Sequence, residues 1–77
     1  MDTVVGKVQY VIDKKTIRIR VTHVGRSNKF DYNSSEMIVI NKNAIAKPVD
    51  KLPGKIVRCF VNYRDEYSRL HADIEDV

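Results

Sequence analysis

The sequence predicts an all-β fold in which short strands close into one small barrel. Apolar and polar residues alternate along most of the chain with the period of two that is typical of half-buried strands. Short polar turns separate the alternating segments. The 77 residues allow a single domain, residues 1–77, and at this length a closed barrel avoids a long open sheet edge.

The first two strands are expected to form an antiparallel hairpin. The first covers residues 4–12, with Gly6 as a bulge or bend. Residues 13–15 form a polar turn, and the second strand covers residues 16–24. The alternation directs toward the core Val4, Val8, Tyr10, Ile12, Ile17, Ile19 and Val21. It directs toward solvent Lys7, Gln9, Arg18, Arg20 and Thr22.

The third strand is expected over residues 37–40, after an irregular loop at 25–36. All four of its residues are apolar, which predicts burial on both faces. Residues 41–55 form a connector that is irregular or contains a helical turn or two. Because proline stops a helix, these turns are expected to end before Pro48.

The last two strands cover residues 56–63 and 67–74. One face of the fourth strand consists of Val57, Cys59, Val61 and Tyr63. Its other face consists of Ile56, Arg58, Phe60 and Asn62. In the fifth strand the inward residues are Leu70, Ala72 and Ile74, and the outward residues are Arg69, His71 and Asp73.

The order of these elements favours an OB-fold-like barrel over an SH3-like barrel. Both fit five strands into a chain of this length. An SH3-like barrel has its long loop between the first and second strands, where this chain has the short turn at 13–15. The long connector lies instead between the third and fourth strands. We therefore predict an OB-fold-like barrel, with the SH3-like barrel as the alternative.

Two short segments resemble the seventeenth small-subunit ribosomal protein family, whose members are OB-folds that bind ribosomal RNA. One comprises Gly6-Lys7-Val8 followed by Lys15-Thr16-Ile17 and Ile19, at the spacing of that family's opening hairpin. The other, Gly54-Lys55-Ile56-Val57-Arg58, is similar to the start of its fourth strand. The chain lacks the family's His-Asp-Glu segment and its Pro-Leu-Ser-Lys stretch. The resemblance implies an OB-fold and a preference for polyanions, and it does not imply membership of the ribosome.

Positive charge is concentrated in the first four-fifths of the chain. Residues 1–64 carry 13 basic and five acidic side chains, a net charge of +8. From Asp65 onward, Arg69 stands against five acidic residues, a net charge of −4. This distribution favours contact between the first part and a polyanion, and it disfavours such contact near the acidic tail.

The candidate nucleic-acid-binding residues combine a basic strand face with aromatic side chains. Arg18 and Arg20 are expected opposite Val11 and Gln9, with Lys7 close by. Cations would contact the phosphate backbone, and aromatic rings would stack on bases. Alternatively, such cations only protect a strand edge from aggregation. The full set of candidates is Lys7, Lys14, Lys15, Arg18, Arg20, Arg26, Lys29, Phe30, Tyr32, Arg58, Phe60 and Arg64.

The sequence argues against an enzyme, a metal site or a cofactor. His23 and His71 are alone on their strands, without the spacing of metal ligands. Cys59 alternates with apolar residues, so it is expected in the core and not as a nucleophile. The single cysteine and the absence of a long apolar segment suit a protein of the cytoplasm, with no membrane partner.

We therefore expect a nucleic-acid-binding module for single-stranded or structured RNA or DNA, with low sequence specificity. The alternative is a small protein-interaction barrel, such as a virus or mobile element could encode, that binds or inhibits a partner protein. The basic face beside an acidic tail would also suit self-association. A third alternative is a subunit of a larger ribonucleoprotein, whose target would be a folded RNA.

Overall fold

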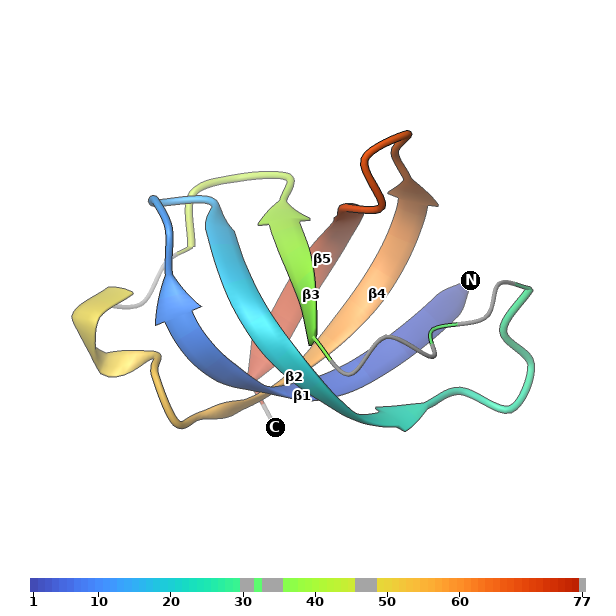
Figure 1. Ribbon diagram of the computed structural model, residues 1–77, viewed down its shortest axis with the longest axis horizontal. Coiled ribbons are helices and arrows are strands. Elements are labelled where there is room, and N and C mark those ends of the chain that lie inside the picture. Colours follow the sequence, from blue (N-terminus) through green and yellow to red (C-terminus); the bar gives the residue numbers. More distant parts are fainter. Residues whose placement is uncertain (30–31, 33–35, 46–48, 77) are drawn as a thin grey trace.

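The computed structural model describes residues 1–29, 32, 36–45 and 49–76, and its strands form a closed barrel (Figure 1). The elements are β1 (Asp2–Val11), β2 (Thr16–Val24), β3 (Glu36–Asn41), a 3₁₀ turn η1 (Val49–Lys51), β4 (Ile56–Arg64) and β5 (Leu70–Asp76). Every strand predicted from the alternation is present, and its ends lie within three residues of those expected.

The barrel closes in the order β1-β2-β3-β5-β4, and β4 returns to pair with β1. The β3–β5 pairing is parallel and short, and the other pairings are antiparallel. The β1–β2 connection is a short turn, whereas a long connector joins β3 to β4. These features confirm the small five-stranded barrel that the sequence predicts, and they are consistent with an OB-fold-like or an SH3-like barrel.

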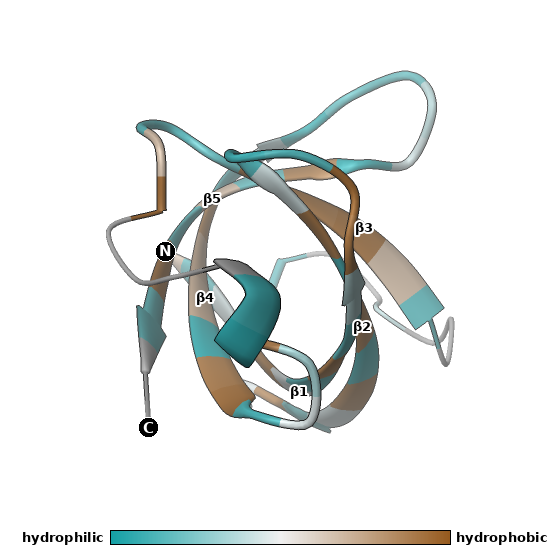
Figure 2. Ribbon diagram, turned by 90° about the vertical axis from the view of Figure 1, so that its left-hand side faces the viewer, coloured by the Kyte–Doolittle hydropathy of each residue, from teal (hydrophilic) through white to brown (hydrophobic). Residues whose placement is uncertain are grey.

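The barrel interior is filled mainly by branched aliphatic side chains. The fully buried residues are Val4, Val8, Ile17, Ile19, Val39, Val57, Cys59 and Leu70. Cys59 is thus the core residue that its alternation predicts, and burial raises the pKa of its thiol to about 12. The η1 turn crosses one end of the barrel (Figure 2), and Leu52, directly after it, is buried in the core.

The connector between β3 and β4 is irregular, which is one of the two predicted forms, but its one described helical turn follows Pro48 and does not precede it. Its described residues before Pro48 contain no helical turn, and η1 follows Pro48. Two backbone N–H groups at the start of the connector bind the β1–β2 turn, and one of them, that of Ile45, is a group that a helix beginning at Asn41 would use. Asn41 N donates to Lys15 O at 2.7 Å, and Ile45 N donates to Lys14 O at 2.9 Å. Residues 46–48 lie outside the described part of the chain.

A β-bulge in β1 reverses the alternation after Val8. Val8 pairs with Ile19 and Tyr10 pairs with Arg18, which leaves Gln9 as an extra residue. The prediction of two core residues beyond this point is therefore wrong. The residues concerned are Tyr10, which is 48% exposed, and Ile12, which is 50% exposed.

A second bulge has the same effect in β4. Val61 pairs with Ala72 and Tyr63 pairs with His71, so Asn62 is the extra residue. Tyr63 is consequently 56% exposed, although the alternation had put it on the core face of the strand. Both Asn62 and Tyr63 now lie on the outside of the barrel.

The third strand alternates, contrary to the expectation of burial on both faces. Met37 and Val39 are buried in the core, whereas Ile38 and Ile40 are only half-buried. A strand in a single-layered barrel has one face toward the interior and one toward solvent. The outer face of β3 therefore presents apolar surface.

Candidate nucleic-acid interface

Two rows of side chains cross the outside of the barrel, and we call this surface the β2–β3 face. One row consists of Tyr63, His71, Ile40 and Thr16, on β4, β5, β3 and β2 in turn. The next row consists of Tyr10, Arg18 and Ile38, on β1, β2 and β3. The face thus has half-buried apolar residues at its centre and an aromatic ring on each side. The bulge in β1 places the Tyr10 ring on this face, and the bulge in β4 places the Tyr63 ring on it.

Glu36 partly neutralises the predicted basic stripe. Arg18 Nη2 donates a hydrogen bond to Glu36 Oε2, and Arg20 Nη2 lies 3.6 Å from Oε1. Gln9 Nε2 donates to the same Oε1 at 2.9 Å. The hydrogen bonds from Gln9 and Arg18 lower the pKa of Glu36 to about 2. The charge of Arg18 is therefore compensated, whereas the Arg20 side chain is 64% exposed.

Tyr10 and Arg18 form a joint surface at the end of β1. The Arg18 guanidinium carbon lies 5.9 Å from the centre of the Tyr10 ring, within the range of a cation–π contact. Glu36 holds the other side of this guanidinium, and its hydrogen bond raises the pKa of Arg18. Since Glu36 fixes the Arg18 guanidinium, the contact with this guanidinium also stabilises the Tyr10 ring on the outside of the barrel.

Asp65 organises the β4–β5 turn. Its Oδ1 accepts hydrogen bonds from the backbone N–H groups of Tyr67 and Arg69, at 2.9 and 3.0 Å. Its Oδ2 lies 2.8 Å from Arg69 Nε and 2.9 Å from His71 Nε2. Partial burial acts to raise the pKa of Asp65, but the hydrogen bonds from His71 and Arg69 outweigh it and keep this pKa below its usual value.

The same turn presents two aromatic groups to solvent. The rings of Tyr63 and His71 are stacked, with centroids 4.2 Å apart and planes within 8° of each other. Tyr67 is 72% exposed, and the Arg69 guanidinium lies 5.2 Å from the centre of its ring. Through its hydrogen bonds to Arg69 and His71, Asp65 therefore positions the side chains that lie against these two aromatic groups.

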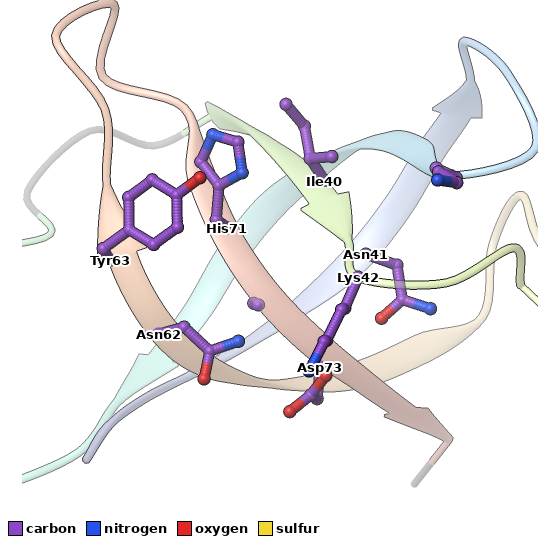
Figure 3. Close-up of a pocket in the computed structure, with 9 residues that line it drawn as sticks. Ile40, Asn41, Lys42, Asn62, Tyr63, His71 and Asp73 are labelled. Carbon is purple, nitrogen blue, oxygen red and sulfur yellow. The ribbon is translucent and has the colours of Figure 1, made fainter.

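A pocket of about 460 Å³ lies where β3 meets β5. Figure 3 shows Tyr63 and His71 on one side of it and Ile40, Asn41 and Lys42 on the other. The polar and aromatic residues of its lining include Lys15, Lys42, Asn62, Tyr63, His71 and Asp73. Its size is in the usual range of small-ligand sites, roughly 300 to 1,000 Å³.

Five predicted cations lie along β1, β2 and their turn. Lys14 and Lys15 are exposed in the turn itself. Arg18 lies opposite Tyr10 and Arg20 lies opposite Lys7, so the expected register is wrong by one residue at Arg18 and, beyond the bulge, by two residues at Arg20. The shift in register at the bulge places Lys7 directly opposite Arg20 on the outer surface of the hairpin.

Arg26 and Lys29 lie at the other end of the barrel. They follow β2 in the loop whose Gly25 N donates to Thr3 O, beside the start of β1. Lys29 N donates to Asp2 Oδ1 at 2.8 Å, which holds this part of the loop. The predicted cations therefore do not form one surface.

Tyr32 is buried and does not present an exposed ring for stacking, which corrects its prediction. It is only 4% exposed, and its hydroxyl donates to Asp2 Oδ2 at 2.7 Å. Burial, followed by the effect of Asp2, raises the pKa of Tyr32, and the charge of Arg64 acts in the opposite direction. Arg64 thus lies near this buried pair, and Phe30 lies outside the described residues.

Arg58 and Phe60 lie on the outer side of β4, next to the acidic residues of β5. Arg58 Nη1 is 3.6 Å from Glu75 Oε1, and Phe60 is half-buried opposite Asp73. Their alternation predicted the outward direction correctly. The ion pair with Glu75 makes Arg58 less available to a phosphate group than an unpaired lysine.

The described residues contain no helix that is long and apolar enough to span a membrane. Comparison of the chain with protein-family models, with curated proteins and with solved structures finds no match. A function for this barrel is therefore inferred from the geometry and charge of its surface.

Proposed function

We propose that this protein binds single-stranded or structured nucleic acid on the β2–β3 face, with low sequence specificity. The observation that carries the proposal is that Tyr10 and Tyr63 are exposed on this face and Tyr67 is exposed in the β4–β5 turn. Arg18 lies against the ring of Tyr10 and Arg69 against that of Tyr67, and His71 stacks on Tyr63. Base–aromatic stacking contributes about 1–3 kcal/mol per base and tolerates any sequence. A basic neighbour adds attraction for the phosphate next to the stacked base.

Lysines beside these rings supply the contacts to phosphate. Lys14, Lys15 and Lys42 are exposed and form no ion pair with any residue of the described part of the chain. Lys15 and Lys42 also line the pocket that contains the Tyr63–His71 stack. Neutralising phosphates at these positions releases counterions, which favours binding at low salt.

The test compares two double variants that change charge by the same amount. Fluorescence anisotropy would measure the affinity for labelled oligo-dT and oligo-U of about 12 nucleotides, with a duplex and a folded RNA as further ligands. Lys14→Glu with Lys15→Glu should weaken binding at least about tenfold at about 50 mM salt. Arg26→Glu with Lys29→Glu, at the other end of the barrel, should weaken it less than about threefold.

Equal losses in both double variants would contradict the proposed face. No binding of any of these nucleic acids by the unaltered protein at about 50 mM salt would overturn the proposed function, because electrostatic binding is strongest there. The alternative function, a barrel that binds a partner protein, would then be favoured. Binding of the folded RNA alone would favour the ribonucleoprotein subunit.

A further inference from the structure

Asp73 is an acidic group in a pocket otherwise suited to a polyanion. It follows His71 on the outer side of β5 and is exposed. Its carboxylate has no hydrogen bond or ion pair with any residue that the structure describes. A carboxylate repels phosphate, so Asp73 beside Lys15 and Lys42 would weaken sequence-independent binding of a phosphate backbone.

The surroundings of Asp73 match the flat, polar shape of a nucleobase. The β4 bulge directs both Asn62 and Tyr63 onto the outside of the barrel, where strict alternation would have exposed only one of them. The Tyr63–His71 stack offers an aromatic surface that a further ring can extend. The side chain of Asn62, like that of Asp73, has no hydrogen-bond partner among the described residues.

Hydrogen-bond chemistry identifies the base. An ionised carboxylate only accepts hydrogen bonds, and its two oxygens match two adjacent N–H donors. On its Watson–Crick edge guanine presents N1–H beside its 2-amino group. Adenine and cytosine place a ring-nitrogen acceptor next to their amino group, and thymine and uracil flank their one N–H with carbonyls. Only guanine therefore meets both oxygens of Asp73 with donors.

We propose that the pocket between β3 and β5 holds one guanine base of the bound strand. The base extends the Tyr63–His71 stack, and Asp73 accepts hydrogen bonds from its N1–H and 2-amino groups. Lys15 and Lys42 lie beside the adjoining phosphates. This inference rests on the proposed function and adds one base-reading position to a surface that is otherwise indifferent to sequence.

The experiment uses oligo-dT of about 12 nucleotides with one central substitution, to guanine, hypoxanthine or adenine. Hypoxanthine lacks only the 2-amino group of guanine. The unaltered protein should bind the guanine oligonucleotide about tenfold more tightly than the adenine one, and about threefold more tightly than the hypoxanthine one.

Asp73→Asn should reduce both preferences to less than about twofold, because the amide would direct its own N–H group toward a guanine donor. Its affinity for plain oligo-dT should stay equal or rise, since a negative charge is lost. The matched control is Glu75→Gln, which removes the same charge on the same strand outside the pocket and should keep the preference for guanine.

Two results would overturn the inference alone. One is equal binding of all three substituted oligonucleotides by the unaltered protein, and the other is an unchanged guanine preference in Asp73→Asn. If the protein binds none of the oligonucleotides, the proposed function and the base-reading pocket fail together.

Discussion

Tyr32 stabilises the barrel through its hydroxyl group, which donates to the buried carboxylate of Asp2. Tyr32→Phe removes this donor and leaves Asp2 Oδ2 without it. We expect the free energy of unfolding to fall by about 1–3 kcal/mol, measured by urea denaturation, with oligonucleotide affinity unchanged. As a control, Tyr67→Phe should change stability by less than about 0.5 kcal/mol, since that ring is exposed. Equal losses in the two variants would contradict this role.

Glu36 makes stability depend on acid pH. Its pKa is lowered from 4.5 to about 2 in the folded protein, chiefly by the hydrogen bonds from Gln9 and Arg18. Its contribution is therefore fully present above the unfolded pKa and is lost as the pH falls through about 2. Glu36→Gln should lose less stability than the unaltered protein between about pH 6 and pH 2.5.

Thermal or urea unfolding at several pH values measures this difference. The control is Glu66→Gln, because Glu66 is exposed and forms no ion pair with any described residue. Its pH profile should follow that of the unaltered protein. A Glu36→Gln profile that is parallel to the control would show that the contacts of Glu36 do not favour its ionised form.

The strand β1 pairs with β2 on one side and with β4 on the other. At Gly6 the β2 backbone comes so close that only glycine fits. Gly6 is buried, and a Cβ atom there would lie 2.7 Å from Arg20 O and 2.9 Å from Ile19 Cδ1. The first contact is with backbone, which cannot turn away as a side chain can. Gly6→Ala should therefore lower the free energy of unfolding by about 1–3 kcal/mol in urea denaturation. A change below about 0.5 kcal/mol would show that the hairpin shifts freely.

The alternation of apolar and polar residues predicted the strands well, because burial on one face demands a period of two. It could not predict the bulges after Val8 and Val61, since an extra residue depends on the partner strand and not on the local sequence. For this reason the alternation put Tyr10 in the core, and Tyr63 on the same face of its strand as the core residue Cys59. Gly6 was the exception, because its residue type itself suggests a bulge, and a register shift does occur there.

Contacts between distant segments were equally hidden. The pairing of Tyr32 with Asp2 joins residues 30 positions apart, and that of Glu36 with Arg18 joins residues 18 positions apart. An aromatic residue in a polar loop looks available for a ligand until its partner is known. In the same way a stripe of arginines looks fully charged until the register brings a carboxylate opposite it.

Across the whole molecule, charges that are separated in the sequence come together in space. The acidic tail forms β5, which pairs with β4, so Glu75 lies against Arg58, while Asp65 is compensated by Arg69 and is hydrogen-bonded to His71. The tail is therefore less repulsive toward a polyanion than its net charge of −4 suggests. Asp73 keeps its charge uncompensated among the described residues, within the pocket that also contains lysines.

The number of uncompensated cations fixes the expected salt dependence of binding. Lys14, Lys15, Arg20 and Lys42 give three or four phosphate contacts, because Arg20 is partly compensated by Glu36. Each contact contributes about −0.7 to the slope of log affinity against log salt for a single strand, so the slope should be about −2 to −3. Between about 50 and 200 mM salt the affinity should fall about 20- to 50-fold.

Anisotropy titrations of oligo-dT at four salt concentrations would measure this slope. The Lys14→Glu, Lys15→Glu variant should reduce its magnitude by about 1.4, the share of two contacts, whereas the Arg26→Glu, Lys29→Glu control should leave it unchanged. A slope near zero in the unaltered protein would mean that stacking alone holds the strand. The lysines beside the Tyr63–His71 stack would then have no part in binding.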